Sequence, residues 1–103
     1  MKKTTIFIVG GSQEQTYKKI GKKAGCDILF HNGKARNGGV KKAFEPMVKK
    51  ADCVVVLAGA CGHETMYSIK ELCKANQIEV VFQKGFGASG AVNAALDRLK
   101  SVA

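Results

Sequence analysis

A cysteine and a histidine stand two positions apart in the segment VVVLAGACGHETMY, residues 54–67. Cys61 and His63 follow a run of branched apolar residues typical of a strand and precede a pattern typical of a helix. A thiol and an imidazole at such a junction suit three roles. They can ligate a metal or haem iron, they can act as a nucleophile with its base, or they can simply pack a corner. The arrangement of the strands and helices around the junction determines which of these roles is feasible.

Four short apolar runs alternate with four helical patterns along the chain. The apolar runs are continuous, as in parallel strands covered on both faces, and they span residues 4–10, 26–31, 53–59 and 78–83. The helical patterns lie near residues 13–23, 38–50, 63–75 and 88–101. This βαβαβαβα order predicts an α/β fold, a small doubly wound (Rossmann-like or flavodoxin-like) sheet of four parallel strands in the order 2-1-3-4, with helices on both faces. Pro46, inside the second helical pattern, predicts a kink or a later start of that helix.

The length of 103 residues predicts one domain, residues 1–103, which would bind a ligand in the manner of Rossmann-like folds. No apolar stretch approaches the roughly 20 residues of a membrane helix, and the first residues do not resemble a signal peptide, so we expect a cytoplasmic protein with no membrane partner. The four cysteines have no CxxC spacing, which favours reduced thiols and argues against structural zinc. Three of them, Cys26, Cys53 and Cys73, are predicted to be buried, leaving Cys61 as the accessible thiol.

The net charge of +9 belongs to the first half of the chain. Residues 1–50 hold twelve Lys and Arg against three acidic residues, whereas residues 51–103 hold five of each. Such a charge favours a solvated surface or an anionic partner. Arginine is scarce and aromatic residues are not interleaved with the lysines, so the pattern does not favour nucleic acid as a partner, although the basic half leaves it open.

Ligands of doubly wound sheets bind beyond the carboxyl ends of the strands, where the strand order reverses. Glycine or small polar residues follow all four predicted strands. Backbone N–H groups there could bind a small anion or a nucleotide without any metal, although the first loop, GGSQEQ, matches neither GxGxxG nor GxxxxGK[ST]. The candidate residues for this site are Gly11, Ser12, Gly87 and Ser89.

Four segments together carry a resemblance to a known family. They are the opening IVGG, the FHNGK after the second strand, KKADCVVVLAGACGHETMYSIKELCK, and the closing GFGASGAVNAAL. The sequence resembles the bacterial family of domain of unknown function 2325 over essentially its whole length. The corner at Gly62 to Met66 is the most specific part, and Gly62 departs from it because serine is commoner there. The resemblance implies the fold and the place of the site, and it implies no reaction.

Catalysis by Cys61 and His63 is the lesser alternative. A helix amino end would lower the pKa of Cys61, and His63 could serve as its base. A phosphatase loop of the form CxxxxxR would require arginine at position 67, which is Tyr67. No acidic residue is placed to orient His63, so we expect a protein that is not an enzyme.

Haem ligation remains as the most specific hypothesis. A b-type haem needs one axial histidine and an apolar slot, whereas zinc needs three or four ligands. We therefore expect a ligand-binding or sensory protein in which His63 ligates haem b, Met66 and Tyr67 flank it, and Cys61 and His31 lie nearby, with His31 as a possible second ligand. CxxCH is absent, so attachment would be noncovalent. The apolar wall would come from Val40, Ile69 and Phe86.

A homodimer is predicted for a different reason. A sheet of four strands has two open edges and a thin core, and a partner subunit would protect both. In such a dimer, His31 of one chain could approach the site of the other.

Overall fold

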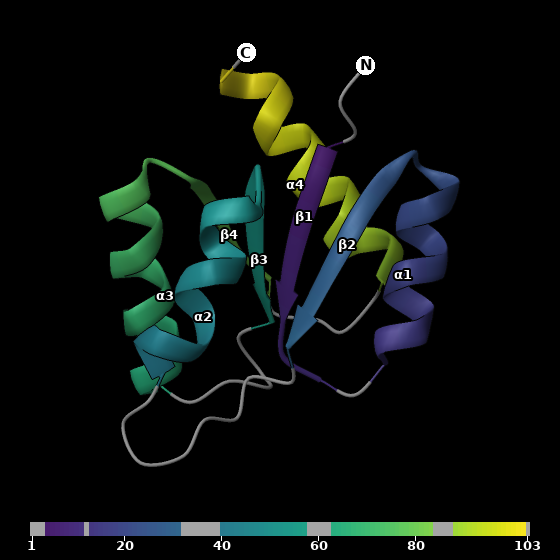
Figure 1. Cartoon of the computed structure of the whole chain (residues 1–103). Helices are drawn as coiled ribbons and strands as arrows, with labels where there is room; N and C mark the ends of the chain where they lie inside the picture. Colours follow the sequence, from purple (N-terminus) through teal and green to yellow (C-terminus); the bar gives the residue numbers. More distant parts are fainter. Residues whose placement is uncertain (1–3, 12, 32–39, 58–62, 84–87, 103) are drawn as a thin grey trace.

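The computed structural model describes residues 4–11, 13–31, 40–57, 63–83 and 88–102; at 40–43, 63–64, 88–89 and 100–102 it describes the backbone alone. Strands and helices alternate strictly. In order, the elements are β1 Thr4–Val9, α1 Glu14–Lys23, β2 Cys26–His31, α2 Val40–Lys50, β3 Cys53–Leu57, α3 His63–Asn76, β4 Glu79–Gln83 and α4 Ala88–Val102 (Figure 1).

All four strands are parallel and form one sheet in the order β2-β1-β3-β4. The predicted fold class and strand order are thus confirmed. The register pairs Val9 with His31 on one side of β1 and with Val56 on the other. Alternating strands and helices favour parallel pairing, because each helix returns the chain to the same end of the sheet before the next strand begins.

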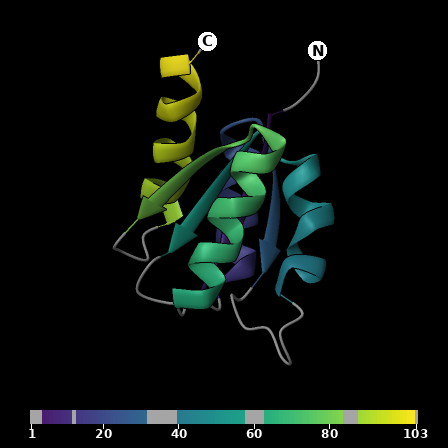
Figure 2. The ribbon, with the colours of Figure 1, turned by 90° about the vertical axis from the view of Figure 1, so that its left-hand side faces the viewer.

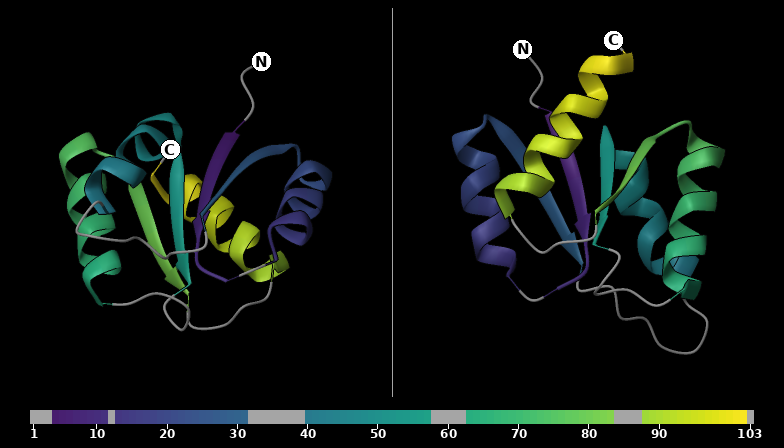
Figure 3. Two further views of the ribbon diagram at one scale, coloured as in Figure 1. Left: turned by 60° about the horizontal axis from the view of Figure 1, so that its bottom comes forward. Right: turned by 180° about the vertical axis from the view of Figure 1, so that it is seen from behind.

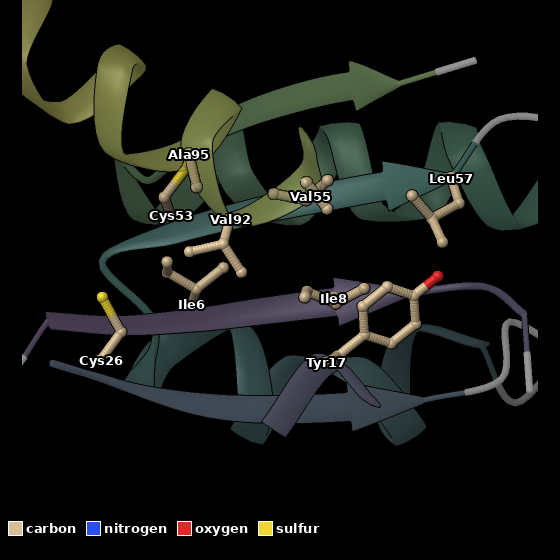
Figure 4. Packing of buried hydrophobic residues seen from close by; sticks show 10 residues of the cluster. Ile6, Ile8, Tyr17, Cys26, Cys53, Val55, Leu57, Val92 and Ala95 are labelled. Atoms are coloured by element: carbon tan, nitrogen blue, oxygen red, sulfur yellow. The ribbon is translucent and has the colours of Figure 1, made fainter. Parts of the chain in front are cut away.

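Alternate residues of each strand point to opposite faces of the sheet. On one face, β1 and β3 present Ile6, Ile8 and Val55 to α1 and α4 (Figure 4). On the other face, Phe7 and Val54 pack against α2 and α3. Every residue of β3 is fully buried, because this central strand has helices on both sides (Figures 1 and 3). A strand buried on both faces reads as a continuous apolar run, which is why β3 was evident from the sequence.

Pro46 lies inside α2, which begins six residues earlier at Val40. The proline therefore does not delay the start of the helix. It is exposed, whereas Phe44 and Val48 are fully buried against the sheet. The proline is tolerated inside α2 because Phe44 and Val48 anchor the apolar side of the helix. Pro46, which has no N–H to donate, lies on the solvent side.

Asp52 ties the end of α2 to the start of β1. Its Oδ2 accepts a hydrogen bond from the N–H of Thr5 at 2.8 Å, and its own N–H donates to the carbonyl of Thr5, also at 2.8 Å. These two bonds satisfy the first backbone groups of β1 and set β3 in register beside it. Among the described residues, no helix is long and apolar enough to cross a membrane.

Candidate functional site

The four strands end at one edge of the sheet, and all four helices begin there (Figure 3, left). After β1 the chain passes to α1 on one face and then to β2, whereas after β3 it passes to α3 on the other face and then to β4. The chain therefore leaves the sheet in opposite directions between β1 and β3, which is the switch point where doubly wound sheets bind ligands. Gly10–Gly11, which follows β1, and the start of α3 at His63 border this point.

Two consecutive glycines shape the first corner. Gly10 and Gly11 have φ of +114° and +86°, conformations that side-chain-bearing residues rarely adopt. The N–H of Gly10 donates to the carbonyl of His31 at 2.8 Å and so extends the pairing of β1 with β2 by one residue. Glycine at these positions lets the backbone turn sharply at the carboxyl end of β1.

Tyr17 of α1 lies beneath this corner. It is fully buried and stacks on Phe30 of β2, with 5.7 Å between ring centroids. A Cβ on Gly11 would lie 3.6 Å from its hydroxyl oxygen and 3.8 Å from Leu57 Cδ1. In Figure 4 the hydroxyl points toward the carboxyl ends of β1 and β3. Burial raises the pKa of Tyr17, so the phenol stays protonated at neutral pH.

His31 ends β2 on the opposite face. Its register partner Val9 belongs to the cluster that α2 and α3 cover, and its ring lies edge-on to Phe44 of α2 with 4.4 Å between centroids. Burial lowers the pKa of His31, which favours the neutral imidazole. A neutral imidazole is the form that ligates metals. The predicted position of His31 on an outer strand is confirmed.

Helix α3 begins at His63, on the same face of the sheet as His31. The side chain of His63 is not among those described. Further along the helix, Met66 packs against the core that α2 and α3 share, whereas Tyr67 is 64% exposed. Ile69, expected as part of a ligand-facing wall, is instead fully buried in that core, because it lies on the stripe of α3 that faces the sheet.

Several predicted site residues lie outside the described part of the chain. They are Ser12, Cys61, Phe86 and Gly87, together with the side chains of Val40 and Ser89. Their roles stay predictions.

Three cysteines are buried and reduced, as predicted: Cys26, Cys53 and Cys73. Burial raises the pKa of Cys53 to about 11 and that of Cys73 to about 12, so neither forms a thiolate at neutral pH. Within the described ranges, no three His, Cys, Asp or Glu residues lie close enough together to hold a metal ion.

Tyr17 and Phe44 were not evident from the sequence as residues of this edge, where Tyr17 lies beside Gly11 and Phe44 contacts His31. Both lie on the apolar stripes of their helices and so read as ordinary core. Only their position in the fold distinguishes them, since Tyr17 stacks on Phe30 and Phe44 lies against His31, the last two residues of β2.

Comparison with known proteins assigns the family. The sequence matches the family described as "Uncharacterized protein conserved in bacteria (DUF2325)" over residues 5–99. The chain belongs to the DUF2325 family. A UPF0751 protein of Bacillus anthracis is 42% identical over 98 residues, which cover 95% of this chain and 98% of the relative.

A more distant relative matches over a somewhat shorter part of the chain. A UPF0751 protein of Desulfitobacterium hafniense is 37% identical over 90 residues, covering 84% of this chain and 87% of its own. No solved structure matches the sequence. The predicted DUF2325 resemblance is thus confirmed.

Proposed function

We propose that this DUF2325 protein is a non-enzymatic ligand-binding or sensory protein that binds haem b noncovalently at the carboxyl edge of the sheet, on the side of α2 and α3. His63 is the axial ligand and His31 is the second imidazole of the same edge. The observation that carries the proposal is the placement of the His31 imidazole on the same face and edge from which α3 begins at His63.

The described residues fit such a group in two respects. Burial keeps His31 neutral, and neutral imidazole is the iron-ligating form. Met66, which is partly buried on the same side of the sheet, supplies apolar surface. A haem site requires one or two axial ligands rather than the three or four of zinc, so two histidines are a sufficient donor set.

Bound haem would supply an iron centre that takes up small ligands and absorbs strongly in the visible range. The protein would supply the axial imidazoles and an apolar shelter. The basic first half of the chain would attract the two propionates.

A haemin titration of the purified full chain, followed by its absorbance, tests the proposal. We expect a Soret band that saturates at one haemin per chain. His63→Ala should abolish it, and His31→Ala should weaken binding and change the spectrum. Because the chain contains two histidines, the double variant removes every imidazole.

Lys70→Ala is the matched control, since Lys70 is an exposed residue of the same helix as His63. It should bind haemin as the parent does. A His63→Ala protein with unchanged affinity and spectrum would end the haem proposal.

A second candidate function is a small-anion or nucleotide sensor at the Gly10–Gly11 corner. The consecutive positive φ values favour it, because a glycine turn can direct a backbone N–H at an anion, and Gly11 is partly exposed whereas the N–H of Gly10 is bonded to His31. In that case inorganic phosphate or ATP should raise the melting temperature of haem-free protein. Gly11→Ala should remove the increase, and His63→Ala should keep it.

A further inference from the structure

The two outer strands of the sheet differ in how they are protected. Helix α1 packs along β2, and it carries four lysines on its solvent side: Lys18, Lys19, Lys22 and Lys23. The net charge of +9 belongs to residues 1–50, which include both elements. Charges of one sign beside an edge strand keep a second copy away from it. The β2 edge is therefore protected against pairing with another copy.

The β4 edge has no such protection. Its sequence is EVVFQ, and the carboxylate of Glu79 is engaged by Arg98 of α4 at 3.0 Å. Residues 51–103 have no net charge. In Figure 2, β4 lies at the margin of the sheet between α3 and α4. A short apolar strand without lysine or proline is open to pairing with a further strand.

The side chains of β4 point to the same conclusion. All five residues are partly or largely exposed, whereas every residue of its neighbour β3 is buried. Phe82 is 44% exposed, and Tyr67 and Phe82 are the large apolar side chains most exposed in the described part of the chain. Phe82 pairs with Val56 and so lies on the α3 face beside Val80.

We propose that β4 is the interface of a homodimer, in which the β4 strands of two copies pair antiparallel about a two-fold axis and form one eight-stranded sheet. The two-fold axis requires antiparallel pairing. With Val81 on the axis, Val80 of each copy would stand opposite Phe82 of the other. Aromatic and β-branched residues in such pairs contribute favourably to sheet stability.

The charge distribution favours a second copy of this chain as the partner that pairs with β4. Two chains of net charge +9 approach with the least repulsion through their neutral halves, and β4 belongs to the neutral half. The arrangement also places the β2 strands at the far ends of the joined sheet. At about 4.8 Å per strand, β2 of one copy would lie about 24 Å from β3 of the other. Both histidines of a haem site would then come from one chain.

Sedimentation of the full chain without haemin tests the interface independently of the proposed function. At tens of micromolar we expect a species of twice 11.0 kDa. Phe82→Lys should raise the dissociation constant at least about tenfold, because it places a charge in each Val80–Phe82 pair. Asp27→Lys, on the exposed part of β2, is the control and should leave the dimer intact.

A monomer at tens of micromolar, a Phe82→Lys protein as dimeric as the parent, or a dimer dissociated by Asp27→Lys would each overturn the proposal. Hydrogen exchange of the unmodified protein gives a second test that does not depend on a variant folding. Amides of β4 should exchange more slowly at 200 µM than at 1 µM, and amides of β2 should not change. Protection that appears in β2 instead would also overturn it.

Discussion

At the scale of single residues, His31 couples folding to pH. Its pKa is lowered in the folded protein below the ordinary value of about 6.5, so the unfolded chain binds a proton at a pH where the folded chain does not. The contribution of His31 to the free energy of unfolding is therefore complete above about pH 6.5. It decreases as the pH falls toward the folded pKa.

Urea denaturation of haem-free protein at pH 7.5 and pH 5 measures this effect. The parent should exceed His31→Gln in stability by more at pH 7.5 than at pH 5. Loss of the ring contact with Phe44 affects both pH values equally, so it cancels from the comparison. An equal difference at the two pH values would contradict the prediction.

Because Gly21 has no side chain, α1 can pack closely against Ile28 of β2. Gly21 is buried on α1, and a Cβ there would overlap Ile28 Cγ1 and lie 2.6 Å from Ile28 Cδ1. Alanine favours a helix by about 1 kcal/mol over glycine, but overpacking costs about 1–3 kcal/mol. We expect Gly21→Ala to lower the free energy of unfolding by about 1 kcal/mol, measured by urea denaturation.

A double-mutant cycle with Ile28→Ala identifies the cause. If overlap with Ile28 is responsible, Ile28→Ala should cost less in the Gly21→Ala background than in the parent. Lys22→Ala, at the exposed next position, should change stability by less than about 0.5 kcal/mol. A Gly21→Ala protein more stable than the parent would show that Ile28 moves aside without cost.

At the scale of elements, the join between α2 and β3 supports the first strand. Asp52→Ala removes the oxygen that accepts the N–H of Thr5 and leaves a partly buried donor without its acceptor. This should cost about 1–3 kcal/mol in chemical denaturation. Asp52→Asn keeps an acceptor oxygen and should cost less. Equal losses in the two variants would mean that the charge matters rather than the hydrogen bond.

The strands and helices could be predicted because their patterns have single physical causes. The five buried residues of β3 form an apolar run, and the parallel pairing follows from the helices that connect successive strands. The predicted strand at 53–59 agrees with Cys53–Leu57 as far as the described residues extend. Pro46 was harder to interpret, since its effect depends on whether it lies on the buried or the exposed side of α2.

The candidate site was predictable only in its location. Strand ends and glycines indicated the carboxyl edge of the sheet, because topology determines where loops meet. The contact of His31 with Phe44 could not be predicted, since it depends on how α2 crosses the sheet. Ile69 was assigned to a wall because its residue type suits both a pocket and a core, and only the packing of α3 distinguishes them.

At the scale of the whole molecule, the uneven charge should make stability depend on salt. On α1, Lys18 and Lys22, and Lys19 and Lys23, are pairs four residues apart that repel by about 0.2–0.5 kcal/mol each. Screening weakens this repulsion. Raising NaCl from about 20 to about 300 mM should therefore raise the melting temperature by about 2–5 °C.

Replacing both Lys19 and Lys23 by Gln should reduce this increase. The control is Lys49→Gln, which removes an exposed lysine that pairs with Glu45 at 3.2 Å and breaks no like-charge pair four residues apart. The control should keep the full increase. A melting temperature that falls with salt would show that ion pairs such as Glu14–Lys18 outweigh the repulsion.

The central position of β1 in the sheet has a consequence for folding during translation. β1 is the first strand to leave the ribosome, yet one of its two neighbours is β3, which is complete only at Leu57. At about 5–20 residues per second, the chain needs about 2–10 s to be extended from Val9 to Leu57. During that time the nascent chain can pair β1 with β2 alone. Chaperones bind apolar strands that have an unpaired edge. The nascent chain should therefore depend on chaperones most before β3 leaves the ribosome.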